Sequence, residues 1–504
     1  MIGEYVSGAL SDIGGYADTA FNETTVRVAV TGLSRAGKTV FLTSLIHNLL
    51  ALGQQRDTLP ALRRHFETGG SSRLRNIRIC GAGASTIPHF DYDAKLAELA
   101  AGSPAWPQRT EDLAEIALEM EVERASPFWQ RLGGRRRIRI ELLDYPGEWL
   151  LDLPLLSQTY KEWSEQTLLM LRRSPRQSVS TPFLDFLTSV QPDEPADDAL
   201  IQRGVSLYRT ALEECRRLGL RYLQPGRFLC PGPRGDVPLL WFFPMDGVPR
   251  YAAQSSLAGL LGDRFEAYKA DIRAQFFDTH FAAFDRQIFL VDVLSALHAG
   301  KEAFEDIKHA ITDIAARLRY GWNWLPRPVV GIAGDAAKIV RSGLAFAGHG
   351  WGAAATQAAS GAIEARNIER VAFVATKADH VPGLRRENLK NLLRNLVETA
   401  RANELPGRPV TYHTVASVLS TVDGTANIDG RPVEVVLGMP LGEERQRAFW
   451  PGDVPSGSPP ESFWSDRFFE LPIFAPPRID PSGATGIPHL GLDEVLAALL
   501  GDAL

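Results

Sequence analysis

A glycine-rich loop between a strand and a helix limits the folds open to this chain. Residues 26–45 read VRVAVTGLSRAGKTVFLTSL. The first of these residues have the β-branched, alternating character of a strand, and the apolar residues from Phe41 onward recur at helical spacing. Between them, Gly32–Thr39 (GLSRAGKT) fits the pattern G-x-x-x-x-G-K-[ST]. The order strand, loop, helix predicts an α/β fold with a phosphate-binding loop.

The loop sequence predicts a cradle for the phosphates of a nucleotide. Glycines let the backbone curl so that successive N–H groups and the helix N-terminus point at one anion. Lys38 would reach the β- and γ-phosphates, and the Thr39 hydroxyl would hold Mg²⁺. The plainer alternative is a tight turn followed by a solvated lysine. The loop residues that we expect to contact the nucleotide are Ser34, Arg35, Ala36, Gly37, Lys38, Thr39 and Val40.

A second candidate site follows the strand-like residues 138–143 (IRIELL), which end in Asp144-Tyr-Pro-Gly147-Glu148. Open α/β sheets bind ligands beyond the carboxyl ends of their strands. Asp144 could therefore bind Mg²⁺ through water, as a Walker-B aspartate does. Gly147 could offer its backbone N–H to a γ-phosphate. An ordinary Asp-Pro-Gly turn is the alternative.

A third segment predicts recognition of a guanine base. Residues 370–376 (RVAFVAT) read as a buried strand and run into Thr376-Lys377-Ala378-Asp379, which resembles the [NT]-K-x-D motif of GTPases. The Asp379 carboxylate can accept hydrogen bonds from N1–H and the exocyclic amino group of guanine, donors that adenine lacks there. Lys377 would lie along the base and brace the phosphate loop, and Thr376 stands where GTPases usually have Asn.

Two weaker signals complete the predicted site. Ala416 and Ser417 follow the strand 410–415 and resemble the S-A-K region, whose backbone N–H contacts the guanine carbonyl. The alternating residues 116–123 predict a hairpin with 137–143 through an Arg/Gly-rich turn. Thr110, in the loop before this hairpin, is the candidate switch residue that completes the Mg²⁺ shell and senses the γ-phosphate. An ordinary loop threonine explains it equally well.

The candidate catalytic residues are Lys38, Glu148, Arg35 and Arg109. Glu148 occupies the position after the D-x-x-G glycine, where Ras-like proteins place a glutamine. It could orient water, but its charge would repel the γ-phosphate, so we expect slow intrinsic hydrolysis. Arg35 or Arg109 could offset this charge as an arginine finger, in cis or across a dimer. Surface salt bridges are the alternative for both.

The segments GLSRAGKT, WPQRT, DYPGEWLLDLPLL and ATKADHV together resemble the YcjX-like family of bacterial stress-associated P-loop proteins, described as GTPases or ATPases. The motifs are spread over residues 26–417. The resemblance implies a Ras-like nucleotide-binding domain with a large helical insertion, a cytoplasmic location and a link to envelope stress.

The residues between the motifs predict the same organisation. Residues 155–173, 198–218 and 260–286 show helical periodicity. The fold class is thus α/β, a P-loop sheet flanked by helices with a mainly helical insertion. We expect an N-terminal helix (1–25), a nucleotide-binding domain in two parts (26–149 and 286–425), a helical insertion between them (150–285), an Ala/Gly-rich segment near 326–365, and a C-terminal hairpin, loop and closing helix (426–504).

Composition narrows the classes of function. The net charge of −6 without a dominant basic stripe argues against nucleic acid as the main ligand. Three cysteines without C-x-x-C spacing argue against structural zinc and a disulfide framework. The first residues lack the basic start of a secretory signal, and no apolar run is long enough to span a bilayer, so we expect a cytoplasmic protein. The expected N-terminal helix is acidic, which favours protein packing over lipid.

These patterns favour a GTP-hydrolysing switch that uses Mg²⁺ and whose helical insertion binds a protein partner. An ATPase or kinase is the alternative that Asp379 argues against. A nucleotide-binding scaffold with little turnover is the alternative that Glu148 leaves open. A dimer and contact with a membrane are both compatible with these patterns.

Overall fold

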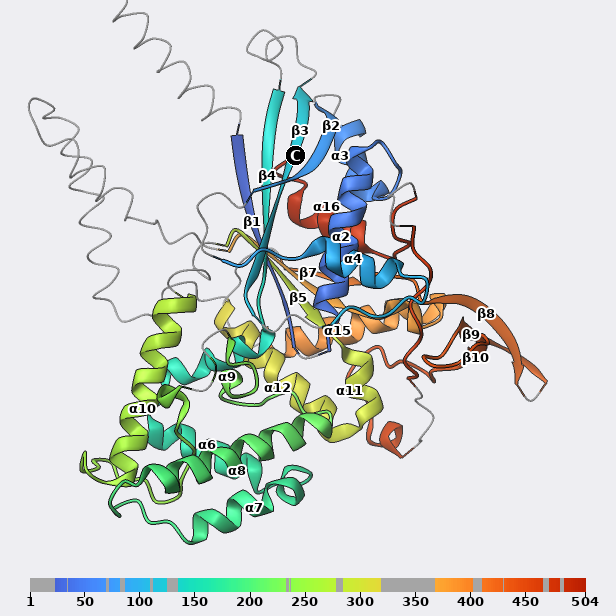
Figure 1. Cartoon of the computed structure of the whole chain (residues 1–504). Helices are drawn as coiled ribbons and strands as arrows, with labels where there is room; N and C mark the ends of the chain where they lie inside the picture. Colours follow the sequence, from blue (N-terminus) through green and yellow to red (C-terminus); the bar gives the residue numbers. More distant parts are fainter. Residues whose placement is uncertain are drawn as a thin grey trace, which may run out of the picture.

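A seven-stranded sheet runs through the centre of the computed structural model (Figure 1). Its strand order is β2-β3-β4-β1-β5-β6-β7. Strands β4, β1, β5, β6 and β7 run parallel, and β2 and β3 form antiparallel pairs at one edge. The strands are β1 (Glu23–Gly32), β2 (Ser72–Cys80), β3 (Ala114–Arg124), β4 (Arg135–Asp144), β5 (Arg286–Val291), β6 (Arg370–Ala375) and β7 (Val410–Thr414). The predicted α/β class is confirmed.

The structure describes most of the chain. Described are residues 23–33, 35–68, 72–81, 87–108, 112–124, 135–232, 235, 237–277, 284–318, 368–401, 410–428, 430–465, 471–480 and 485–504. The expected N-terminal helix before residue 23 and the Ala/Gly-rich segment 326–365 lie outside these residues. So do three candidate site residues, Ser34, Arg109 and Thr110.

Helices cover both faces of the sheet. Val26, Val28 and Val30 of β1 pack in one core with α2 (Lys38–Gly53), α3 (Pro60–Thr68), α4 (Tyr92–Ala100) and α16 (Leu492–Leu500). Phe289 of β5 and Phe373 of β6 belong to the other core, which includes α11 (Val293–Ala299), α12 (Lys301–Leu318) and α15 (Arg386–Arg401). Parallel strands buried on both faces are mainly apolar. Every residue of β5 is buried, and Ile-Phe-Leu-Val follows Arg286 and Gln287 in it.

Between β4 and β5 the described chain forms a helical part that lies below the sheet in Figure 1. Trp163 is fully buried in its core and packs against Phe242 and Phe265. Helical periodicity was expected over 260–286, whereas the α-helix α10 ends at Ile272 and continues as a π-helical turn to Phe277. The elements are η1 (Gly147–Asp152), η2 (Pro154–Ser157), α6 (Tyr160–Leu171), α7 (Arg176–Thr188), α8 (Asp198–Arg217), α9 (Gly226–Leu229), η4 (Pro238–Leu240), α10 (Leu257–Ile272) and η5 (Arg273–Phe277).

The antiparallel parts of the fold include one predicted and one unpredicted element. The expected hairpin is confirmed, since β3 and β4 pair from Ala114↔Asp144 onward. The edge strand β2 has no counterpart among the sequence expectations. It is stabilised by cross-strand ion pairs of Arg75 with Glu123 and of Arg78 with Glu119.

The C-terminal region forms a second, three-stranded sheet that projects from the body of the molecule at the right of Figure 1. It consists of β8 (Thr421–Ile428), β9 (Arg431–Gly438) and β10 (Arg447–Phe449), and the expected turn at Gly430 joins β8 to β9. Short 3₁₀ helices include η8 (Ala378–His380) and η9 (Gly383–Arg385), which follow β6, and η10 (Glu461–Trp464), which follows β10. The last helix is the predicted closing helix α16.

Candidate functional site

A cavity of about 830 Å³ lies at the carboxyl ends of the parallel strands. It is lined by the phosphate loop, by the segment after β6 and by the segment after β7. The volume falls within the range of small-molecule and cofactor sites. The expected site residues among its lining are Arg35, Ala36, Gly37, Lys38, Thr39, Val40, Glu148, Thr376, Lys377, Asp379, Ala416 and Ser417.

The phosphate loop needs glycine at two positions. Gly37 has φ 82°, in the left-handed region that favours glycine, and α2 begins directly after it at Lys38. At Gly32 a Cβ atom would lie 2.7 Å from the carbonyl oxygen of Leu290 and 2.9 Å from the Ala36 Cβ. The loop therefore packs tightly against the end of β5. Arg35 also has a positive φ of 68°, and its exposed side chain lines the cavity.

Lys38 and Asp144 form the ionic centre of the site. The Lys38 ammonium lies 3.0 Å from Asp144 Oδ1 and donates a hydrogen bond to the Tyr145 carbonyl at 2.8 Å. Asp144 is 1% exposed, and within the described residues neither of its carboxylate oxygens accepts a hydrogen bond of good geometry. Lys38 is the cation that accompanies this buried carboxylate, and another cation would have to replace it if Lys38 turned to a bound phosphate.

This arrangement fits Mg²⁺, a hard cation that takes oxygen ligands and keeps several waters. The Thr39 and Asp144 side chains would hold it next to the phosphates. The described residues contain no group of three or more His, Cys, Asp or Glu side chains that could hold a metal. The remaining ligands would therefore be phosphate oxygens and water.

Gly147 lies on the phosphate loop itself. A Cβ atom at this position would be 2.3 Å from the Gly32 carbonyl oxygen and 2.9 Å from the Leu33 nitrogen. The turn after β4 is thus in direct contact with the loop, although Gly147 does not line the cavity. Glu148, next in the chain, is 8% exposed and forms part of the cavity wall.

Asp379 lines the same cavity and is 2% exposed. Its Oδ2 atom accepts hydrogen bonds from the Ser420 N–H at 2.9 Å and from the Ser420 hydroxyl at 2.7 Å. These two bonds fix the orientation of the carboxylate. Sequence reasoning missed Ser420. The available signal was a second serine three residues after Ser417 in the stretch A-S-V-L-S.

Lys377 lines the same cavity as the phosphate loop. Its ammonium donates to Asp292 Oδ2 at 2.6 Å and to the Ser295 hydroxyl at 3.1 Å. Its expected place along the base stays a prediction. Burial alone would favour a neutral Asp292, but the Lys377 ammonium and the hydrogen bonds from Ser295 lower the pKa of this carboxyl below its ordinary value. Asp292 follows β5 directly and was not predicted.

Ala416 forms two backbone hydrogen bonds with the C-terminal segment. Its N–H donates to the Leu490 carbonyl at 3.1 Å, and its carbonyl accepts the Leu490 N–H at 2.9 Å. This amide is therefore engaged by the C-terminal segment and is not available to a base carbonyl. The backbone of Thr376 is also hydrogen-bonded: its N–H donates to the Val291 carbonyl at 3.0 Å and links the end of β6 to β5.

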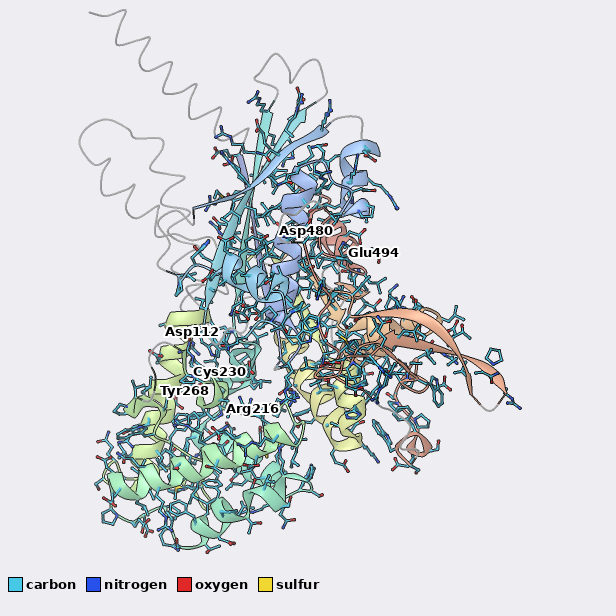
Figure 2. All side chains as sticks on the ribbon, turned by 45° about the vertical axis from the view of Figure 1, so that its right-hand side comes forward. Asp112, Arg216, Cys230, Tyr268, Asp480 and Glu494 are labelled. Carbon is cyan, nitrogen blue, oxygen red and sulfur yellow. The ribbon has the colours of Figure 1, made fainter. Side chains whose placement is uncertain are left out.

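The segment after Gly147 anchors the site to the helical part. Asp152 accepts hydrogen bonds from the Tyr268 hydroxyl at 2.6 Å and from the Gly226 N–H at 2.7 Å. Trp149 donates to the Cys230 carbonyl at 2.9 Å. Burial raises the pKa of Asp152 to about 6, against the lowering effect of its hydrogen bonds. Tyr268 and Cys230 are labelled in Figure 2.

Two further segments complete the cavity wall. Leu471, Pro472, Ile473 and Phe474 come from the C-terminal region, and Trp106 ties the pre-hairpin loop to them by donating to the Phe474 carbonyl at 2.7 Å. The helical part contributes Arg217, Leu218, Gly219 and Arg221. Apart from Trp106, which belongs to the WPQRT segment, sequence reasoning identified none of these residues, because no local pattern marks them.

The whole chain is similar to known proteins. Residues 26–504 match the YcjX-like family, DUF463. The protein named Ras-like GTPase YcjX from Escherichia coli (strain K12) is 31% identical over 489 residues, which cover 95% of this chain and 96% of that protein. The protein of the same name from Shewanella oneidensis (strain MR-1) is 30% identical over 501 residues, 95% of this chain and 94% of that protein. Among the described residues, no helix is long and apolar enough to cross a membrane.

Proposed function

Because this chain belongs to the YcjX-like family and has a Ras-like P-loop fold, we propose that it binds GTP and hydrolyses it to GDP and phosphate. The relatives named Ras-like GTPase YcjX support this activity. The observation that carries the proposal is that Asp379 and the phosphate loop line one cavity.

The phosphates bind at Gly32–Thr39, where backbone N–H groups and the start of α2 meet. Lys38 moves from the Asp144 carboxylate toward the β- and γ-phosphates. Gly147 approaches the γ-phosphate with its backbone, because it already lies against the loop. Thr39 and Asp144 would hold Mg²⁺, which would neutralise phosphate charge. Thr110 is the proposed switch residue.

The base binds beside Asp379. Ser420 orients its carboxylate, which accepts hydrogen bonds from the guanine N1–H and amino groups. With adenine this buried carboxylate loses its donors, which costs about 1–3 kcal/mol per unsatisfied group. The guanine carbonyl meets the backbone near Ser417, since the Ala416 N–H is already bonded.

Hydrolysis in the isolated protein is slow. Glu148 lines the cavity, and its expected role is to orient the attacking water. Its negative charge also repels the γ-phosphate. The protein acts as a cytoplasmic switch in a bacterial stress response, and its helical insertion, residues 150–285, carries the surface for a protein partner.

A scaffold that binds nucleotide and scarcely turns it over is the second candidate. Glu148 in the cavity wall is the observation that favours it. Measured release of phosphate from GTP separates this candidate from the first, because the scaffold would retain GTP unchanged through many binding lifetimes.

The test of guanine specificity is titration of the purified protein with fluorescent GDP and ADP. We expect at least about 100-fold tighter binding of GDP. The Asp379→Asn variant is expected to lose this preference and to bind xanthosine diphosphate more tightly than GDP. Asp453→Asn is the matched control, since Asp453 is exposed and pairs with the exposed Arg385. Equal affinity of the unmodified protein for GDP and ADP would refute the guanine assignment.

A further inference from the structure

A loop of the helical part reaches the nucleotide cavity. It leaves α8 at Arg217 and enters α9 at Gly226. Arg221, near the middle of this loop, lines the same cavity as the phosphate loop and Glu148. The loop belongs to the segment between β4 and β5, so an element outside the central sheet contributes a cation to the site.

The loop is held firmly against the sheet domain. Asp306 of α12 is 8% exposed, and its Oδ2 atom accepts the backbone N–H groups of Arg221 and, at 2.8 Å, Tyr222. Its Oδ1 atom accepts a bond from Arg176 at 2.6 Å. At Gly219, with φ 92°, a Cβ atom would lie 2.8 Å from the Ala299 Cβ. These contacts fix the backbone from which Arg221 extends.

The Arg221 side chain is held in a way that leaves its charge unneutralised. Its Nη1 atom donates to the carbonyl groups of Arg216, labelled in Figure 2, and Leu220, at 3.2 and 3.0 Å. Within the described residues, no carboxylate oxygen lies within ion-pair distance of the guanidinium. Arg217, the neighbouring cavity arginine, pairs with Glu214.

Charged groups of the nucleotide site surround this guanidinium. Burial lowers the pKa of Arg221, and the charges that act on it are those of Asp292, Arg35, Asp306 and Glu148. Arg35 belongs to the phosphate loop, and Glu148 follows Gly147. Arg221 therefore lies among the groups that would surround the γ-phosphate. Its positive charge offsets the negative charge of Glu148.

We propose that Arg221 is a catalytic arginine that the helical part supplies in cis to the triphosphate. The inference rests on the GTP hydrolysis proposed above. In that reaction the water oxygen forms a bond to the γ-phosphorus, and the bond from this phosphorus to the β–γ bridging oxygen breaks. The electron pair of the broken bond stays on GDP, and the water proton passes to the phosphate product. The Arg221 guanidinium donates hydrogen bonds to the oxygens that gain negative charge.

This role makes hydrolysis depend on how the helical part sits on the sheet domain. An arginine fixed in advance needs no reorganisation when charge develops, which is the source of its effect on rate. A lysine would not replace it, because an ammonium lacks the planar fork that binds two phosphate oxygens together.

The test uses the full chain with Arg221→Ala, Arg221→Lys and the control Arg172→Ala. Arg172 lies in the same helical part and pairs with Asp246 away from the cavity. We expect the Arg221 variants to bind fluorescent GDP within about threefold of the unmodified protein. Their single-turnover hydrolysis of GTP is expected to fall about 1,000-fold, whereas Arg172→Ala keeps its rate. Added guanidinium ion is expected to restore part of the rate of Arg221→Ala.

Affinity for GDP with aluminium fluoride, which resembles the transferring phosphoryl group, gives a second readout. It is expected to fall in Arg221→Ala while GDP affinity is retained. A hydrolysis rate within tenfold of the unmodified protein, in a variant with unchanged thermal unfolding, would refute the catalytic role and leave the proposed GTPase activity intact. Absence of GTP hydrolysis in the unmodified protein would refute both. If Arg221→Ala fails to fold, the single-turnover hydrolysis rate of Arg221→Lys decides whether Arg221 is catalytic.

Discussion

Gly147 and Gly32 touch through their backbones: a Cβ atom on Gly147 would lie 2.3 Å from the Gly32 carbonyl oxygen. The turn after β4 therefore rests on the phosphate loop. The same turn continues into Glu148, whose carbonyl oxygen would lie 1.9 Å from a Cβ atom on Gly226 of the helical part. Two glycine contacts thus connect the phosphate loop, the turn and the helical part.

This contact predicts the effect of Gly147→Ala. The added methyl group cannot fit without movement of the turn, so we expect the free energy of unfolding to fall by about 1–3 kcal/mol. GTP hydrolysis is expected to slow because the turn is displaced from the loop, whereas GDP affinity changes little. Urea unfolding and single-turnover hydrolysis measure these effects. Gly102→Ala is the control, since no atom lies within 4 Å of a Cβ there, and an equal effect of both substitutions would contradict the contact argument.

The Asp144 carboxylate predicts a strong dependence on Mg²⁺. Removal of the metal with EDTA is expected to abolish hydrolysis of GTP. In Asp144→Asn, the Mg²⁺ concentration for half-maximal hydrolysis is expected to rise about 10- to 100-fold, because the buried carboxylate no longer attracts the ion through its water ligands. Titration of Mg²⁺ at saturating GTP measures this shift. An unchanged midpoint would remove Asp144 from the metal site.

Asp152 predicts a pH dependence of stability. Its pKa is about 6 in the folded protein, above the value of about 3.9 in an unfolded chain. The folded state therefore binds more protons between these values, and the stability that Asp152 contributes is present below about pH 4 and is lost as the pH rises through about 6. The loss amounts to about 3 kcal/mol.

The comparison of Asp152→Asn with the unmodified protein measures this effect. From pH 4 to pH 7 the free energy of unfolding of the unmodified protein is expected to fall relative to the variant. Urea unfolding at a series of pH values provides the measurement. Asp246→Asn is the control, because Asp246 lies half-exposed in the helical part. Parallel pH profiles for Asp152→Asn and the unmodified protein would show that Asp152 has an ordinary pKa.

Asp306 predicts a positioning effect on Arg221. In Asp306→Asn, one acceptor for the loop amides or for Arg176 is lost, so the loop shifts and Arg221 is less well placed. We expect a lower turnover number with little change in the KM for GTP. In the Arg221→Ala background the same substitution is expected to have no further effect on turnover. Glu305→Gln on the same helix, where Glu305 pairs with Lys308 at the surface, is the control. Independent effects of the two substitutions would argue for a purely structural role of Asp306.

Much of the fold followed from local patterns. The strand before Gly32, the strand before Asp144 and the strand before Thr376 are apolar runs that end in polar motifs, and each is observed as a parallel strand. The edge strand β2 was missed, because half of its residues are exposed and polar and its pairing depends on distant glutamates. Asp292, the partner of Lys377, was also missed, since it follows a strand without any motif that marks it.

The sequence alone determined the phosphate loop, the strand ends that carry Asp144 and Asp379, and the α/β class. Such features depend on neighbours within a few residues, and parallel strands bring their carboxyl ends to one edge whatever the length of chain between them. Only the tertiary structure decided that Ser420 holds Asp379, that Leu490 engages Ala416 and that Arg221 enters the cavity. The Arg221 loop is fixed by Asp306, 85 positions later in the chain, and by the close packing of Gly219 against Ala299. Contacts between such distant segments depend on how helices pack, which no short pattern in the chain records.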